Sequence, residues 1–84
     1  MALYTVVWKP KAQDQLTDQW LNASDPNAVT RAADRIEKYL TRSPGQFGES
    51  RAGNERLAFV PPLSVTFRIS EPDRLVEVLA IGHS

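Results

Sequence analysis

The strongest constraint on the fold is a hairpin pattern in the last third of the sequence. Between residues 63 and 69, apolar and polar side chains alternate strictly, which is the period of a half-buried β-strand. Pro72 and Asp73 then predict a turn, because proline presets φ and the Asp side chain can bond nearby backbone. Residues 75–81 follow as an apolar strand interrupted by Glu77, and the histidine of the chain, His83, comes just after them. Such a hairpin requires a sheet with one buried face and one polar face.

Length and composition limit the classes of protein that fit. A chain of 84 residues supports one modest core, so residues 1–84 form a single domain. It has no cysteine, which excludes a disulfide scaffold, and no apolar run approaches the roughly 20 residues of a membrane helix. No secretion signal is recognisable, so we expect a cytoplasmic protein without membrane contact. With no cysteine and one histidine, neither a metal site nor a cofactor is expected.

The formal charge is balanced. Ten basic and ten acidic residues cancel. This argues against strong non-specific binding of nucleic acid, which depends on many phosphate contacts. Local charged patches can still form on a neutral protein.

Two helical segments follow a short strand at residues 4–8. Residues 10–21 place apolar side chains four apart, which predicts an amphipathic helix. Asp25 and Pro26 predict the start of a second helix, with the Asp side chain accepting from free backbone N–H groups and proline in the first turn. That helix has a continuous apolar face and ends before Pro44.

The rest of the chain supplies a loop and further strands. Residues 43–55 predict a long, glycine-bearing loop without the strand-to-helix context of a phosphate-binding motif. Residues 56–60 predict a short strand that Pro61 and Pro62 terminate. The order of elements is therefore β-α-α-β-β-β. Two N-terminal helices must cover one face of a mostly antiparallel four-stranded sheet, giving an α+β fold.

In this order and spacing the chain resembles the RelE/ParE superfamily of toxins from bacterial type II toxin–antitoxin pairs. The resemblance rests on the opening strand and helix start at residues 4–12, the second helix and its exit at residues 33–49, and closing strands at residues 56–57, 65–69 and 76–83. It covers most of the chain and contains no single specific motif. It implies growth inhibition, a role in plasmid stabilisation, and a cognate antitoxin protein as partner.

The resemblance implies two modes of action. RelE-type toxins are ribosome-dependent mRNA endonucleases that cleave with basic and acid–base groups on the open sheet face. A cation of that set falls here at Ser64, the group near the end of the last strand matches His83, and a further group would lie beyond Ser84. This incomplete set favours the ParE mode, which inhibits DNA gyrase by binding. A non-toxic interaction module with the same fold is a third possibility.

Four residues besides His83 are candidates for the site. In a nuclease, Arg56 and Arg68 would neutralise phosphate charge and His83 would move a proton. In a binding protein, Arg56, Arg68, Ser64 and Arg51 would contact the target or the antitoxin.

Each candidate also has a structural alternative. His83 could instead be a surface residue at the end of the chain. Arg68 could pair with Glu77 across the hairpin, and Arg56 could be a charge that protects an edge strand from aggregation. Arg51 could serve solubility alone.

Strand alternation predicts where these side chains lie. Val65 and Phe67 must point toward the helices, so Arg56 and Arg68 are expected on the opposite, polar face. Strict alternation along the last strand places residues 76, 78 and 80 in the core. His83 then joins Arg68 on the polar face.

Overall fold

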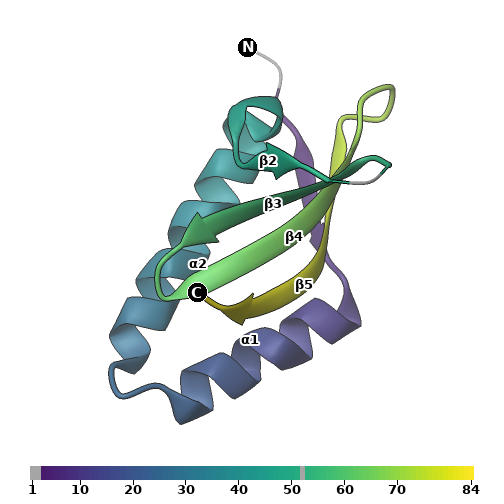
Figure 1. Cartoon of the computed structure of the whole chain (residues 1–84). Coiled ribbons are helices and arrows are strands. Elements are labelled where there is room, and N and C mark those ends of the chain that lie inside the picture. Colours follow the sequence, from purple (N-terminus) through teal and green to yellow (C-terminus); the bar gives the residue numbers. More distant parts are fainter. Residues whose placement is uncertain (1–2, 52) are drawn as a thin grey trace.

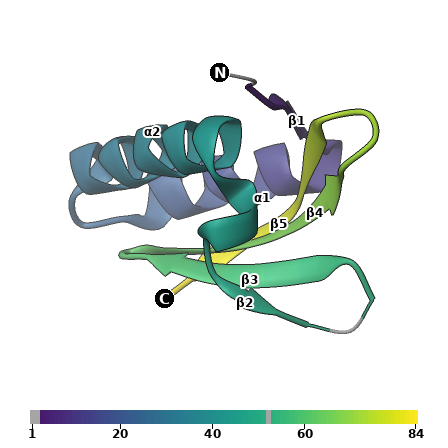
Figure 2. The same cartoon turned by 90° about the horizontal axis from the view of Figure 1, so that it is seen from above.

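A computed structural model of the chain describes residues 3–51 and 53–84 (Figure 1). In chain order its elements are β1 (Thr5–Trp8), α1 (Pro10–Asn22), α2 (Pro26–Arg42), the short 3₁₀ helix η1 (Pro44–Gln46), β2 (Glu49–Ser50), β3 (Glu55–Val60), β4 (Leu63–Ser70) and β5 (Leu75–His83). Both α-helices lie on one face of a single sheet, as the view from above shows (Figure 2). The two-layer α+β fold is therefore confirmed.

The sheet has five strands rather than the four predicted. Its order is β1-β5-β4-β3-β2, with β1 parallel to β5 and every other neighbouring pair antiparallel. The additional strand, β2, is two residues long and lies within the predicted loop. It pairs with β3 through Glu49 opposite Leu57 and Ser50 opposite Arg56.

The helices begin where the prolines predict. Pro10 and Pro26 are the first residues of α1 and α2, where the missing N–H of proline would have no helical partner anyway. Asp25 occupies the N-cap position of α2, but its side chain makes no capping hydrogen bond, so the predicted side-chain cap is wrong. Its carboxylate instead lies 3.8 Å from the guanidinium of Arg31, and its backbone carbonyl accepts from the N–H of Ala28.

The core is formed between α2 and the central strands. Val29, Ile36 and Leu40 of α2 are buried against β4, whose Phe67 is fully buried. None of the helices in the described ranges is both long and apolar enough to span a membrane.

The last strand contains a β-bulge. Phe67 pairs with Val78, but Thr66 pairs with Ala80, so Leu79 is one residue more than β4 can match. The strict alternation predicted for β5 is therefore wrong beyond Val78. Ala80 leaves the core-facing side.

The bulge moves the next odd-numbered residue inward. Ile81, predicted on the polar face, pairs with Val65 and is buried in the core. Burying Ile81 in place of Ala80 removes a larger apolar side chain from water, which favours the bulged arrangement.

Candidate functional site

The sheet face away from the helices holds a small charged cluster. Arg68 donates from Nε and Nη2 to Oε1 of Glu77, at 3.1 and 2.9 Å. The ammonium group of Lys9, just after β1, lies 3.2 Å from the other oxygen of the same carboxylate. The predicted alternative in which Arg68 pairs with Glu77 across the hairpin is confirmed.

The two cations keep Glu77 ionised. Hydrogen bonds from Arg68, and then from Lys9, hold the pKa of the Glu77 carboxyl below its ordinary value. One carboxylate therefore fixes the positions of two positive groups on this face. The Arg68 side chain is 43% exposed and can still be reached by a partner.

Around this cluster the open face carries both polar and apolar side chains. The register places Ser64 opposite Phe59 and Thr66 opposite Leu57, so these four residues share the face. Phe59 is 59% exposed and Val7, on β1, is 41% exposed. An exposed apolar surface with an arginine beside it has the composition of a protein-binding face.

Arg56 does not belong to this face. It lies opposite the fully buried Phe67, so its side chain is on the helix side of the sheet. It donates from Nε to the carbonyl of Phe47 (3.1 Å), from Nη2 to the carbonyl of Gly48 (2.9 Å) and from Nη1 to Oγ of Ser50 (2.9 Å). The prediction that Arg56 joins Arg68 is wrong, because the short turn after Val60 sets the register of β3 against β4. Arg56 ties the chain between α2 and β3 to the sheet.

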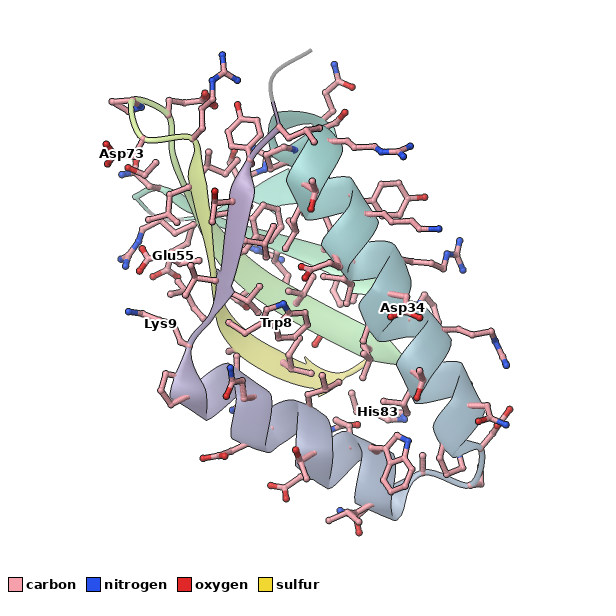
Figure 3. All side chains as sticks on the ribbon, turned by 180° about the vertical axis from the view of Figure 1, so that it is seen from behind. Trp8, Lys9, Asp34, Glu55, Asp73 and His83 are labelled. Carbon is pink, nitrogen blue, oxygen red and sulfur yellow. The ribbon has the colours of Figure 1, made fainter. Side chains whose placement is uncertain are left out.

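His83 is also on the helix side. Its pairing partner on β4 is the buried Leu63, and it borders an open hollow of about 870 Å³ at the end of the molecule. Figure 3 shows it near the ends of the helices, apart from Lys9 and Glu55. The predicted position of His83 beside Arg68 is wrong because of the bulge at Leu79.

His83 is also far from Arg68 along the sheet. From Leu63, the partner of His83, to Arg68 is five residues, about 17 Å of strand. Arg51 follows β2, exposed, with its guanidinium 4.0 Å from Glu49. The structure thus brings Ser64 and Arg68 onto one face and leaves Arg51, Arg56 and His83 elsewhere.

Lys9 is the member of the cluster that the sequence did not suggest. It reaches Glu77 because β1 lies parallel to β5, with Val7 opposite Glu77. No local pattern in the sequence specifies a pairing between the first and last strands.

A second surface feature lies between the helices. A cleft of about 290 Å³ separates the outer surfaces of α1 and α2, and most of its lining is apolar. Leu16, Trp20, Val29 and Ala33 contribute that lining. Trp20 is 46% exposed there, although Ala12 and Leu16 on the same helical stripe pack into or against the core.

No protein-family model matches the chain, and no curated protein sequence matches it. Solved structures do. A chain of the toxin–antitoxin complex RelBE2 from Mycobacterium tuberculosis matches with a TM-score of 0.81 over 100% of this chain and 94% of that chain, at 21% identity. A chain of the chromosomal ParDE system from Pseudomonas aeruginosa matches with a TM-score of 0.70 over 99% and 98%, at 22% identity. The chain has the RelE/ParE toxin fold.

This likeness confirms the resemblance seen in the sequence at the level of the fold. The RelE/ParE-like fold is not restricted to toxin–antitoxin complexes. TrmO from Pseudomonas aeruginosa matches 98% of this chain with a TM-score of 0.64 at 22% identity, over 36% of its own length. The function of this RelE/ParE-like chain must therefore be argued from its surfaces.

Proposed function

We propose that the chain is the toxin of a bacterial type II toxin–antitoxin pair and that it acts by binding its target rather than by cutting RNA. The toxin–antitoxin assignment is supported by the match to chains of two toxin–antitoxin assemblies. Each match covers nearly the full length of this chain and of the chain it is compared with. The fold alone does not distinguish binding from cleavage.

One observation carries the choice of binding. A general acid–base centre needs its groups within hydrogen-bond reach of one substrate. Here Arg68 is on the open face, Arg56 is committed to the backbone of residues 47 and 48 on the helix side, and His83 is at the far end of that side. These three side chains cannot meet at one phosphate in this arrangement.

The open face is the proposed target-binding surface. Arginine and aromatic side chains contribute disproportionately to protein interfaces, and this face presents Arg68 and Phe59 around a polar centre at Ser64 and Thr66. DNA gyrase is the target that the resemblance to ParE implies.

The antitoxin is proposed to cover the cleft between α1 and α2. An amphipathic helix can place its apolar side chains in such a groove, and burial of Trp20 and its neighbours would supply the binding energy.

Three experiments test the proposal. Inducible expression should arrest bacterial growth, and co-expression of the neighbouring antitoxin gene should restore it. Full antitoxin binding without growth arrest would instead identify a non-toxic interaction module.

Purified protein should inhibit DNA supercoiling by gyrase, and the Arg68→Ala variant should inhibit it less. Primer extension on ribosome-bound message should show no cleavage. Cuts that disappear in His83→Ala would replace the binding mechanism with the ribosome-dependent endonuclease.

A further inference from the structure

Helix α2 carries a row of cations along its outer surface. Arg31, Arg35, Lys38 and Arg42 follow one another at spacings of four, three and four residues, and all four are exposed, away from the buried stripe that contains Ile36. At about 1.5 Å per residue, successive cations are about 4.5–6 Å apart along the helix axis. A linear polyanion could contact several of them at once.

Three of these cations border two adjacent hollows. A hollow of about 350 Å³ is lined by Arg35, Lys38, Tyr39, Arg42 and Ser43. A second hollow, of about 260 Å³, is lined by Arg35, Tyr39, Phe47, Phe59, Val60 and Pro61. Because Arg35 and Tyr39 line both, the two hollows lie side by side between the end of α2 and the end of β3. We refer to them together as the α2–β3 groove.

The cations of this groove are not neutralised locally. Among the residues that the structure describes, the ion pairs include neither Arg35 nor Lys38 nor Arg42. The acidic residues of α2 border other elements: Asp34 borders the cleft between the helices, and Glu37 accepts from the indole N–H of Trp8, on β1, at 3.3 Å. A chain of zero net charge thus presents a positive groove.

Aromatic side chains stand beside these cations. Tyr39 is 44% exposed, and one side of its ring stacks on Phe47 with centroids 4.8 Å apart. Phe47 stacks in turn on the buried Phe67, at 5.6 Å, so Tyr39 is held in place from the core outward. Fixed, exposed rings beside cations are the combination on which single-stranded nucleic acids bind, with bases stacked and phosphates paired.

We propose that the α2–β3 groove binds a single-stranded nucleic acid. Its phosphates contact Arg35, Lys38 and Arg42, and its bases lie against Tyr39 and Phe59. This inference does not rest on the proposed toxin function, although Phe59 belongs to both surfaces.

An acidic polypeptide strand fits the groove less well. A strand would have to add to the edge of β3, but Glu49 and Ser50 already pair with the first half of that strand. Pro61, which follows β3, has no N–H to offer. Little edge remains for main-chain hydrogen bonds.

Fluorescence anisotropy with short labelled oligouridylate and oligothymidylate tests the proposal. Three phosphate contacts on a single strand predict a slope of about −2 in log affinity against log salt, or roughly a 20-fold loss between about 50 and 200 mM. The variant R35Q/R42Q should bind about tenfold or more weakly and reduce the slope to below about 1 in magnitude. The matched variant K11Q/R74Q, which removes the same charge from exposed positions elsewhere, should retain the wild-type affinity and slope.

The aromatic contribution is tested separately. Tyr39→Phe keeps the ring and should bind as wild type does, whereas Phe59→Ala should bind about fivefold or more weakly. Phe59 is mostly exposed, so its removal should leave thermal unfolding nearly unchanged.

Three results would overturn the proposal. One is a wild-type protein that binds neither oligonucleotide at low salt. Another is an equal loss of affinity in K11Q/R74Q and R35Q/R42Q, which would show dependence on net charge alone. The third is a labelled oligoglutamate that binds more tightly than either oligonucleotide and depends on Arg35 and Arg42, which would make the groove a protein-docking site.

Discussion

Arg56 and Arg68 occupy neighbouring positions in the sheet and face opposite sides of it. Arg56 lies opposite Phe67, the residue just before Arg68 on β4. Arg56 donates all its hydrogen bonds inward to the segment after α2, whereas Arg68 shares Glu77 with Lys9 on the open face. The same residue type therefore has a structural role in one case and an accessible position in the other.

Alanine substitutions should separate these two roles. Arg56→Ala removes the donor of two backbone carbonyls, one of them part-buried, and we expect it to lower the free energy of unfolding by about 1–2 kcal/mol. Arg68→Ala should cost about 0.5 kcal/mol or less, because the site is exposed and Lys9 still pairs with Glu77. Urea unfolding of both variants beside the wild type measures the difference. Equal losses would contradict the assignment of Arg56 to the helix side.

The pH dependence of stability should report on Glu77. Because its pKa in the folded protein lies below the ordinary value of 4.5, its ion pairs stabilise the fold above that pH. That contribution is lost as the pH falls through the lowered pKa and Glu77 takes up a proton. Glu77→Gln should therefore lower the melting temperature at neutral pH, and the gap from wild type should close below about pH 4.5. Melting curves from neutral to acid pH test this, and a gap independent of pH would exclude it.

The local pattern of residues 56–60 alone could not predict on which side of the sheet Arg56 lies. Residues 56–60 contain apolar side chains in both alternating sets, so either set could face the core. The register with β4 decides, and the turn at Pro61 and Pro62 sets it by placing Val60 opposite Leu63. That turn length was visible in the sequence and could have identified the correct face.

At the scale of elements, local periodicity predicted both helices and the strands of the hairpin. It could not predict β2, because two residues are too few to show alternation. It also missed the bulge in β5, since that depends on how the strand packs across β4 rather than on its own sequence. The displaced His83 is the functional consequence, because one additional residue transfers it to the other face.

The bulge can be tested with two truncations. Ile81→Ala removes a buried side chain and should cost roughly 2–5 kcal/mol in the free energy of unfolding. Leu79→Ala, at the partly exposed bulge position, should cost about 1 kcal/mol or less. Denaturant unfolding of the pair provides the comparison. Strict alternation would put both residues on the polar face and predicts similarly small losses.

At the scale of the whole molecule, net charge hides the separation of charge between surfaces. The balance of ten basic and ten acidic residues argued against nucleic-acid binding. The cations of α2 nevertheless line one groove, while Asp34 borders the cleft toward α1 and Glu37 contacts Trp8 of β1. The sum of charges does not depend on fold, whereas the groove exists only after α2 has packed beside β3. The open face and the α2–β3 groove are then two surfaces that meet at Phe59, which belongs to both.

Substitutions on one of these two surfaces should leave the function of the other unchanged. Arg68→Ala should weaken growth inhibition and leave oligonucleotide binding at the wild-type level, because Arg68 lies on the sheet face away from α2. R35Q/R42Q should do the reverse, since both arginines belong to α2, which covers the face of the sheet opposite Arg68. Growth after induced expression and anisotropy on the same purified variants provide both readouts, with thermal unfolding as the control for folding. If either well-folded variant lost both activities together, the two surfaces would be parts of one site, and the separation of a target-binding face from a nucleic-acid groove would be wrong.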